Sequence, residues 1–417
     1  MKYGGFFKTL TLLVTVLLAG SCNQDPIFYK ISQETKPLEP RIKGTPTNMA
    51  VFEWADPADS SKTVPVLFVA SGRLHWYGRP VPGAGPRWDS GGFDIPQPGG
   101  NVFGLAATKD YLYVLCFTGS GLSAEVKRIG RNEQEWKTVG FDSGALSHGY
   151  HQTIYADSET VFLGSRGGST APGSYAILYL TGTGSTQFKS LKTGVELLKG
   201  AASDGANYYL ATEGSGIWKV EKNALPSDSP IVTRLGDSGY IFKGIINISD
   251  TNSTAGIIAV RNDGTLFSVN GTGTGLNSGA DFDPYSTGAL ALWRDPEDSP
   301  EPEDPSPAPK LLLAGVQGAK TMTTSSGYTH GYTEIEINTT SGAIVSGSGF
   351  HNPGNGSPTS IVNNERYTAS LGKYPINFLF QAPKEIDDKM TLFASTQTHG
   401  LWSYRTRDGE PQWNAEE

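Results

Sequence analysis

Histidines bind metals and move protons near neutral pH, and this chain of 417 residues has six of them. His148 and His151 are close in sequence, but no carboxylate or cysteine stands at metal-ligand spacing beside them. Surface or turn positions are therefore favoured over a metal site. The remaining histidines are His75, His330, His351 and His399. The sequence predicts no metal and no cofactor.

Carboxylates offer a second kind of chemistry. A glycan hydrolase or lyase would need two carboxyl groups about 5–10 Å apart, and Glu213 with Asp263 is the pair that the repeat pattern below could bring together. The chain has no H-E-x-x-H, G-x-S-x-G, Walker-type G-K-[ST] or C-x-x-C motif. An enzyme stays an alternative, and a binding role is favoured.

A binding rim is predicted from polar residues that the repeats place on loops of one shared face. Solvated loop residues would have the same composition, so the sequence leaves their role open. The candidates are Arg73, Arg166, Glu213, Arg261, Asp263, Lys320, Gln397 and His399.

The N-terminus has the features of a secretion signal. Lys2 and Lys8 flank the start of the apolar run Leu10–Leu18, which small residues and Cys22 follow, as in a secretory signal peptide. The run is too short for a membrane span, which needs roughly 20 apolar residues. The site resembles a bacterial lipobox, which implies cleavage after residue 21 and acylation, for instance with palmitate, of Cys22. The usual Leu three places before the Cys is Ala19 here, a relaxation typical of spirochaete lipoboxes. A plain secretory signal is the alternative.

Cysteine usage and charge narrow the partners. If Cys22 carries lipid, Cys116 has no disulfide partner, and its apolar surroundings, Tyr111–Phe117, indicate an inert buried thiol. Cleavage would remove Lys2 and Lys8 and change the net charge from −8 to −10. Nucleic acids and anionic headgroups bind clustered Lys and Arg, so they are not expected as main partners.

The composition and the spacing of glycines indicate that many short strands position these residues. Glycine makes up 52 residues, about 12%, well above the usual ~7%, and no long helical period occurs. Strands that begin with Gly and small residues recur at Gly104, Gly149, Gly200, Gly244 and Gly288, at intervals of 45, 51, 44 and 44. This period is typical of β-propeller blades.

Each of these strands is followed by a more apolar one, as expected where neighbouring blades cover both faces of a strand. There are seven such runs: Val66–Ala70, Leu112–Leu115, Val161–Leu163, Tyr208–Ala211, Ile257–Val260, Leu311–Ala314 and Leu392–Ala394. A third strand often opens with Gly and carries an aromatic, and a ragged fourth leads into the triplet Asp-Ser-Gly. The fold is therefore predicted to be all-β, a seven-bladed β-propeller of four-stranded antiparallel blades, with eight blades as the alternative.

The triplet Asp-Ser-Gly begins at Asp89, Asp142 and Asp237, with a near copy at Asn277. We expect it at the turn between blades, where Asp closes the turn through its side chain and Gly supplies a positive φ. A ring of cation-binding carboxylates is the less favoured reading.

The domain plan follows from these patterns. Residues 1–21 are predicted to be the signal peptide, 22–47 a lipid-anchored linker, and 48–417 the propeller. Two spacers interrupt the repeats: an acidic Pro-rich loop at 294–309 and an insertion at 351–374. The last outer strand is expected at the tail, Pro411–Ala415, rather than at Ile27–Ser32.

The repeats resemble bacterial seven-bladed propellers of the WD40-like or YVTN-like kind over residues ~48–417, at the level of class. The Trp-Asp of WD40 repeats occurs here once, at Trp88-Asp89, and the sialidase-type box is missing. The resemblance and the anchor imply a lipid-anchored binding or scaffolding module at the bacterial envelope, on the periplasmic side or the outer-membrane surface, with a protein or glycan partner. A glycan-processing enzyme and a component of envelope assembly, as in outer-membrane protein insertion, are the alternatives.

Overall fold

The computed structural model describes only part of the chain, and every described residue belongs to the compact unit Glu39–Glu417. The described part does not include the predicted signal peptide, Cys22, Ile27–Ser32 or most of the predicted linker. The described residues are 42–81, 83–90, 92–118, 124–143, 145, 150–166, 175–182, 185–227, 230–248, 256–269, 276–278, 285–294, 310–319, 331–337, 375–407 and 410–416.

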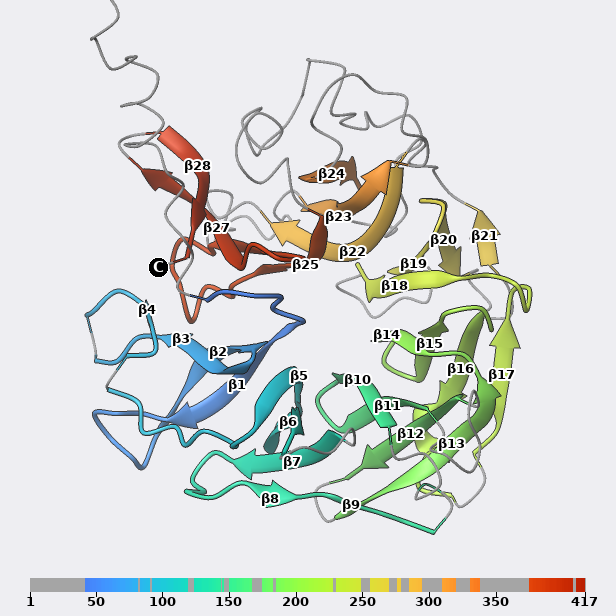
Figure 1. Ribbon diagram of the computed structural model, residues 1–417, viewed down its shortest axis with the longest axis horizontal. Helices are drawn as coiled ribbons and strands as arrows, with labels where there is room; N and C mark the ends of the chain where they lie inside the picture. Colours follow the sequence, from blue (N-terminus) through green and yellow to red (C-terminus); the bar gives the residue numbers. More distant parts are fainter. Residues whose placement is uncertain are drawn as a thin grey trace, which may run out of the picture. The chain divides into compact units, whose positions relative to one another are not determined.

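The described strands form seven sheets that follow one another along the chain, the blades of a seven-bladed β-propeller (Figure 1). Within each blade, consecutive strands pair antiparallel from the inside outward.

Blade 1 contains β1 (Met49–Ala55), β2 (Thr63–Ser71), β3 (Arg73–Gly78) and β4 (Arg87–Trp88). Blade 2 contains β5 (Asn101–Ala107), β6 (Tyr111–Phe117), β7 (Ala124–Gly130) and β8 (Lys137–Thr138). Blade 3 contains β10 (Tyr150–Ala156), β11 (Thr160–Arg166), β12 (Tyr175–Thr181), β13 (Gln187–Val195) and β9 (Gly140–Phe141).

Blade 4 contains β14 (Leu198–Ser203), β15 (Asn207–Thr212), β16 (Ile217–Glu221) and β17 (Val232–Leu235), with a 3-10 turn, η1 (Lys222–Ala224). Blade 5 contains β18 (Phe242–Asn247), β19 (Ile257–Arg261), β20 (Leu266–Val269) and β21 (Leu276–Ser278). Blade 6 contains β22 (Tyr285–Arg294), β23 (Lys310–Ala319) and β24 (Gly331–Glu336). Blade 7 contains β25 (Ile376–Gln381), β26 (Leu392–Thr396), β27 (Leu401–Arg407) and β28 (Glu410–Ala415).

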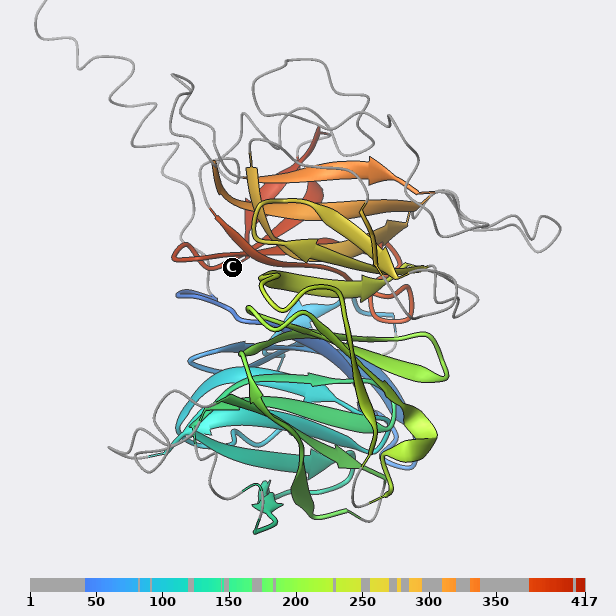
Figure 2. The same ribbon diagram turned by 90° about the vertical axis from the view of Figure 1, so that its right-hand side faces the viewer.

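The hydrophobic core lies between the blades. Among the described residues it divides into seven clusters, each shared by two successive blades, and one of them joins blade 7 back to blade 1. Figures 1 and 2 show the same succession, with the red strands of blade 7 beside the blue strands of blade 1. Seven interfaces between seven sheets close the ring, and the seven-blade prediction is confirmed.

The second strand of each blade explains the apolar runs. In β6, Leu112 and Val114 pack toward blade 1, whereas Tyr113 and Leu115 pack toward blade 3, and all four are buried. Successive strand residues point to opposite faces, so a strand covered on both faces must be apolar at every position. The predicted apolar runs coincide with the second strands of all seven blades.

The strands that begin with Gly and small residues are the innermost strands of the blades, and they are crowded against one another, but Gly149 is not the equivalent of Gly104 in blade 3. A Cβ on Gly104 would lie 3.2 Å from Ile154 of the next blade, and one on Gly200 would lie 2.9 Å from Ile245. Strand pairing puts Thr153 at this position in blade 3, and the small residue stands opposite it on β11, at Gly164.

Blade 3 departs from the four-strand plan. Its fifth strand, β9, comes from the link that follows blade 2 and pairs parallel with β13. Phe141 of β9 stacks on Phe188 with 5.5 Å between ring centroids, so the link is held to the outer edge of the blade.

Both ends of the propeller chain close the ring. The tail forms β28, which pairs antiparallel with β27, so the predicted closure by the tail is confirmed. Glu416, after β28, is 1% exposed and accepts hydrogen bonds from Trp88 Nε1 of blade 1 and from Ser403 Oγ.

Residues 42–48, here named the closing segment, fasten the same junction from the other end. The oxygen of Ile42 accepts a hydrogen bond from Leu401 N at 3.1 Å, and that of Pro46 accepts one from Ser395 Oγ at 2.6 Å, both from blade 7. The Ile42 side chain is fully buried. Thr47 Oγ1 then reaches the oxygen of Phe103 in blade 2 at 2.6 Å.

The triplet Asp-Ser-Gly lies between blades, as predicted, but the glycine of the third triplet, the one triplet glycine that the structure describes, does not have the expected conformation. Asp142 Oδ1 accepts a hydrogen bond from Ala145 N at 2.8 Å and closes its turn as expected. Gly239, however, is not in the positive-φ region. The positive φ instead belongs to Gly236 (75°), just before the third triplet, and to Asp89 itself (45°).

Apart from Arg294, the last residue of β22, the two spacers fall outside the described residues. The acidic loop connects β22 to β23, whose ends pair at Arg294 and Lys310, and residues 351–374 precede β25. Within the described part of the chain, no helix is long and apolar enough to cross a membrane.

Candidate functional site

The blade topology creates two faces. The upper face carries the turns between second and third strands, such as Ser71–Arg73, and the links between blades. The lower face carries the turns between first and second strands, such as 108–110, and those between third and fourth strands. The seven predicted rim residues that the structure describes occupy, or directly adjoin, the turns between second and third strands, so they belong to the upper face.

A β-bulge recurs at the upper end of the innermost strands. Six of the seven described innermost strands skip one residue in their pairing with the second strand. A bulge leaves its extra residue unpaired and re-aims its side chain. The residues at these bulges are Phe103, Gln152, Lys199, Lys243, Gly288 and Asn377. The same backbone irregularity thus presents, from blades 2 to 7, an aromatic residue, two amides, two lysines and a glycine.

Glu213 joins two of these bulges. Its carboxylate lies 3.0 Å from Lys199 Nζ and 2.8 Å from Lys243 Nζ, and the three side chains are 26%, 25% and 35% exposed for Lys199, Lys243 and Glu213. Partial burial raises the pKa of Glu213, but hydrogen bonds from the two lysines outweigh this and hold the pKa below its usual value. The cluster is an ionised carboxylate between two ammonium groups, with a local charge of one positive unit.

Arg261 and Asp263 pair with each other across the β19–β20 turn, with 2.8 Å between Arg261 Nε and Asp263 Oδ1. The guanidinium also lies over the rings of Tyr240 and Phe267, at 5.1 and 5.3 Å. Burial raises the pKa of Asp263, but hydrogen bonds from Arg261 and from the backbone of Thr265 lower it to about 2.

These pairings bear on the carboxylate hypothesis. Glycoside hydrolysis requires one carboxyl group that is protonated near neutral pH, so that it can donate a proton to the leaving group. Glu213 and Asp263 both have lowered pKa values, and each is held by its own cationic partners. Neither carboxyl group has the properties of a proton donor.

Arg73 forms part of a network that the sequence did not suggest. Asp89, with a side chain 5% exposed, accepts hydrogen bonds from Arg73 and from Trp76 N, and its Oδ2 lies 2.9 Å from His75 Nδ1. Burial raises the pKa of Asp89, but His75 and Arg73 outweigh it and lower the pKa. The pairing of the β3–β4 hairpin explains this contact. Tyr77 pairs with Trp88, which puts the next residue, Asp89, opposite Trp76 and beside the start of β3.

The other rim candidates have local partners. Arg166 lies 5.9 Å from the ring centroid of Tyr175, and Gln397 N donates to the oxygen of Pro375 at 3.0 Å. The His399 ring contacts Thr398 Oγ1 at 2.8 Å, and Gln397 and His399 are both exposed. Lys320 lies outside the described residues.

His151 and Cys116 are both buried and have structural roles. His151 is 5% exposed, bonds Ser165 Oγ at 2.7 Å and stacks on Phe141, so its expected surface position is wrong. Cys116 is fully buried, and burial raises the pKa of its thiol, as expected for an inert cysteine. Within the described ranges, no group of three or more His, Cys, Asp or Glu side chains could hold a metal ion.

Comparisons with known proteins bear on the fold. No family model matches the chain, and no curated protein matches it. The chain is similar to the crystal structure of the extracellular domain of a proposed one-component system from B. thetaiotaomicron, with 12% identity, a TM-score of 0.51 and 89% of this chain covered. It spans 40% of the length of that chain. It is also similar to YCF48 in the structure bound to D1 peptide, with 11% identity, a TM-score of 0.47, and 90% of this chain and 96% of that one covered.

Proposed function

We propose that this protein is a lipid-anchored binding or scaffolding module of the bacterial envelope, which presents its upper face to a protein or glycan partner. Residues 1–21 serve as the signal peptide, and acylated Cys22 is the membrane anchor. Of the expected linker, residues 22–47, the part from 42 onward packs on the blades as the closing segment, so residues 22–41 act as the linker and the remainder forms the binding propeller. The likeness to an extracellular domain supports a location outside the cytoplasm.

The observation that carries the proposal is the recurring bulge. The same bulge recurs in a rigid scaffold, but the residue at the bulge varies. Binding surfaces are built in this way, because the residues that contact a partner can change without changing the fold. Phe103, Gln152 and Lys199 give this ring an aromatic, an amide and a cation. The charged groups around Glu213 are already paired, so their positions are fixed before a partner arrives.

Photo-crosslinking from the upper face tests the proposal. A photoactivatable residue replaces Gln152 in the full, lipidated chain, and adducts from intact envelopes are identified by mass spectrometry as protein or glycan. A matched probe replaces Glu135, which is exposed on the β7–β8 turn of the lower face. We expect a defined adduct from position 152, reduced at least fivefold when Lys199→Gln and Lys243→Gln are combined. Equal capture from both positions would refute the proposal.

A further inference from the structure

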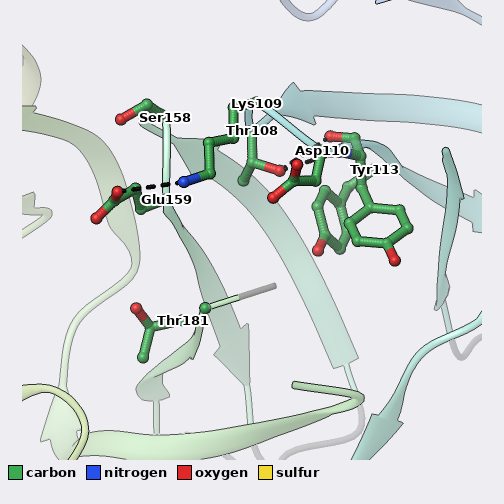
Figure 3. A pocket seen from close by; sticks show the side chains of 9 residues that line it. Thr108, Lys109, Asp110, Tyr113, Ser158, Glu159 and Thr181 are labelled. Atoms are coloured by element: carbon green, nitrogen blue, oxygen red, sulfur yellow. Dashed lines mark hydrogen bonds and ion pairs between the residues drawn. The ribbon is translucent and has the colours of Figure 1, made fainter. Parts of the chain in front are cut away.

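A second candidate binding site lies on the lower face, away from the rim. It is a pocket of about 220 Å³ between blades 2 and 3 (Figure 3). One wall comes from the β5–β6 turn and the start of β6, and the other from the β10–β11 turn and the end of β12. The lining residues are Thr108, Lys109, Asp110, Tyr111, Tyr113, Ser158, Glu159, Thr181 and Gly182.

The backbone holds the two walls together. Lys109 N donates to the oxygen of Ser158 at 2.9 Å, which joins the turns of blades 2 and 3. Gly182 N donates to the oxygen of Glu159 at 3.3 Å, which fixes the end of β12 against the same turn. The pocket therefore exists before any ligand binds, which lowers the entropic cost of binding.

Arg128 of β7 braces the aromatic side of the pocket. Its guanidinium lies 4.3 Å from the ring centroid of Tyr111, and Nη1 donates to the oxygen of Ser185, beyond the opposite wall, at 2.8 Å. Tyr113 is 2% exposed, and burial raises the pKa of its phenol, so it stays a neutral donor. The Tyr111 and Tyr113 rings meet edge to face at 6.1 Å.

The charges of the pocket balance. Among the lining residues, Lys109 faces two carboxylates, Asp110 and Glu159. Arg128 lies outside the lining, against the Tyr111 ring, and its charge offsets the second carboxylate, so an anion gains nothing from the local charge. Figure 3 shows the Lys109 and Glu159 side chains pointing toward each other across the pocket, with 3.5 Å between Nζ and Oε1. Both are more than half exposed, so a ligand could open this pair at little cost.

Size and lining together indicate a sugar ring. Pockets for drug-sized ligands are roughly 300–1,000 Å³, and this one is smaller. Its lining combines tyrosine rings with hydroxyl, ammonium and carboxylate groups. A pyranose has both an apolar C–H surface and several hydroxyls that donate and accept hydrogen bonds, which matches such a lining.

We propose that this lower-face pocket binds one neutral sugar residue. The site is independent of the proposed upper-face function, because the two share no residue. Lys109 and Glu159 supply a donor and an acceptor for sugar hydroxyls, and Tyr111 contacts the ring. Tyr113 packs behind Tyr111, and Arg128 acts as a positioning residue.

Saturation-transfer NMR on the full chain tests the site with methyl α-D-glucopyranoside and N-acetylglucosamine as neutral probes and glucuronate as the charged probe. We expect saturable binding of at least one neutral sugar with a Kd on the order of 1 mM, and weaker binding of glucuronate. Glu159→Gln should weaken binding roughly fivefold, because it loses a charge-assisted hydrogen bond, and Ser158→Trp, at an exposed position, should block it.

The matched control is Glu135→Gln, which removes the same charge from an exposed position of the β7–β8 turn. It should bind as the unchanged protein does, and circular dichroism should show all variants folded. Failure of both neutral sugars to bind, stronger binding of glucuronate, or binding that persists in Ser158→Trp would each overturn the proposal. Crosslinking from the upper face reports on the proposed function separately.

Discussion

At the residue scale, the aspartates of the Asp-Ser-Gly triplets make two different kinds of contact. Asp142 accepts a hydrogen bond from its own turn, whereas Asp89 reaches back to β3 and holds Arg73, His75 and Trp76 N. The difference arises from β3, which presents a cation and an imidazole beneath the first triplet. A local motif therefore fixes where the turn lies, and the neighbouring strand decides what its carboxylate binds.

Asp89→Asn should lower the free energy of unfolding by about 1–3 kcal/mol, because a buried charge-assisted acceptor is lost beside Arg73 and His75. Urea unfolding at neutral pH measures this change. Asp142→Asn, in the second copy of the triplet, keeps an oxygen for Ala145 N and should cost less than about 1 kcal/mol. Equal losses in the two variants would contradict the distinction.

The lowered pKa of Asp89 also predicts how the stability difference between the unchanged protein and Asp89→Asn depends on pH. Asp89 has a folded pKa below its ordinary value of 3.8, so it stabilises the fold above that pH, and this contribution is lost as pH falls through the lower folded pKa. The difference in unfolding free energy between the unchanged protein and Asp89→Asn should therefore shrink below about pH 4. A difference that grows in acid would mean that the carboxylate is not stabilised by its partners.

At the element scale, the ring is fastened twice at one junction. β28 completes blade 7, and Glu416 carries the contact on to Trp88 of blade 1. The closing segment lies over the same junction through Leu401 and Ser395. A propeller needs such a closure, because its first and last blades are not otherwise joined along the chain.

Removal of residues 416–417 should destabilise the ring by about 1–3 kcal/mol, because Trp88 Nε1 and Ser403 Oγ lose their buried acceptor. Removal of residue 417 alone is the control and should leave the thermal midpoint unchanged. Differential scanning calorimetry compares the two. A stable protein after the longer truncation would show that β28 and the closing segment suffice.

The acidic spacer should contribute little to stability. It connects β22 to β23, which pair antiparallel up to Arg294 and Lys310, so a two-residue Asn-Gly turn could replace residues 295–309. The thermal midpoint should stay within a few degrees, as expected for a Pro-rich segment of low hydrophobicity. A fall of ten degrees or more would mean that the segment packs against the blades.

The sequence predicted elements where one physical constraint dominates. The second strands are covered on both faces and show it as unbroken apolar runs, and β28 follows β27 through a short turn. It missed β9, because a two-residue strand carries no period, and the bulges, because they appear only when two strands are paired. The burial of His151 depends on Phe141 in that link, and the lower-face pocket on contacts between turns of different blades.

At the scale of the whole molecule, the closing segment, residues 42–48, lies on the upper face of the propeller. The closing segment contacts Ser71, Gln397 and Gly400, which belong to upper-face turns of blades 1 and 7. Nineteen residues lie between Cys22 and Ile42, and the linker proposed there would span about 25 Å as a flexible chain. We therefore expect the binding face to stay within a few tens of ångströms of the anchor.

Lipidation at Cys22 is the premise of that geometry. Cys22→Ser should move the protein from the membrane to the soluble fraction and abolish labelling by a clickable palmitate analogue. Stable anchoring takes two acyl chains, and the diacylated thiol of the proposed lipobox would carry both. The matched control is Cys116→Ala, which removes the fully buried thiol of β6 and should keep both the label and the membrane fraction. Detergent partitioning of Cys22→Ser identical to that of the unchanged protein would exclude the acyl anchor, and the upper face would then be free of any fixed distance from the membrane.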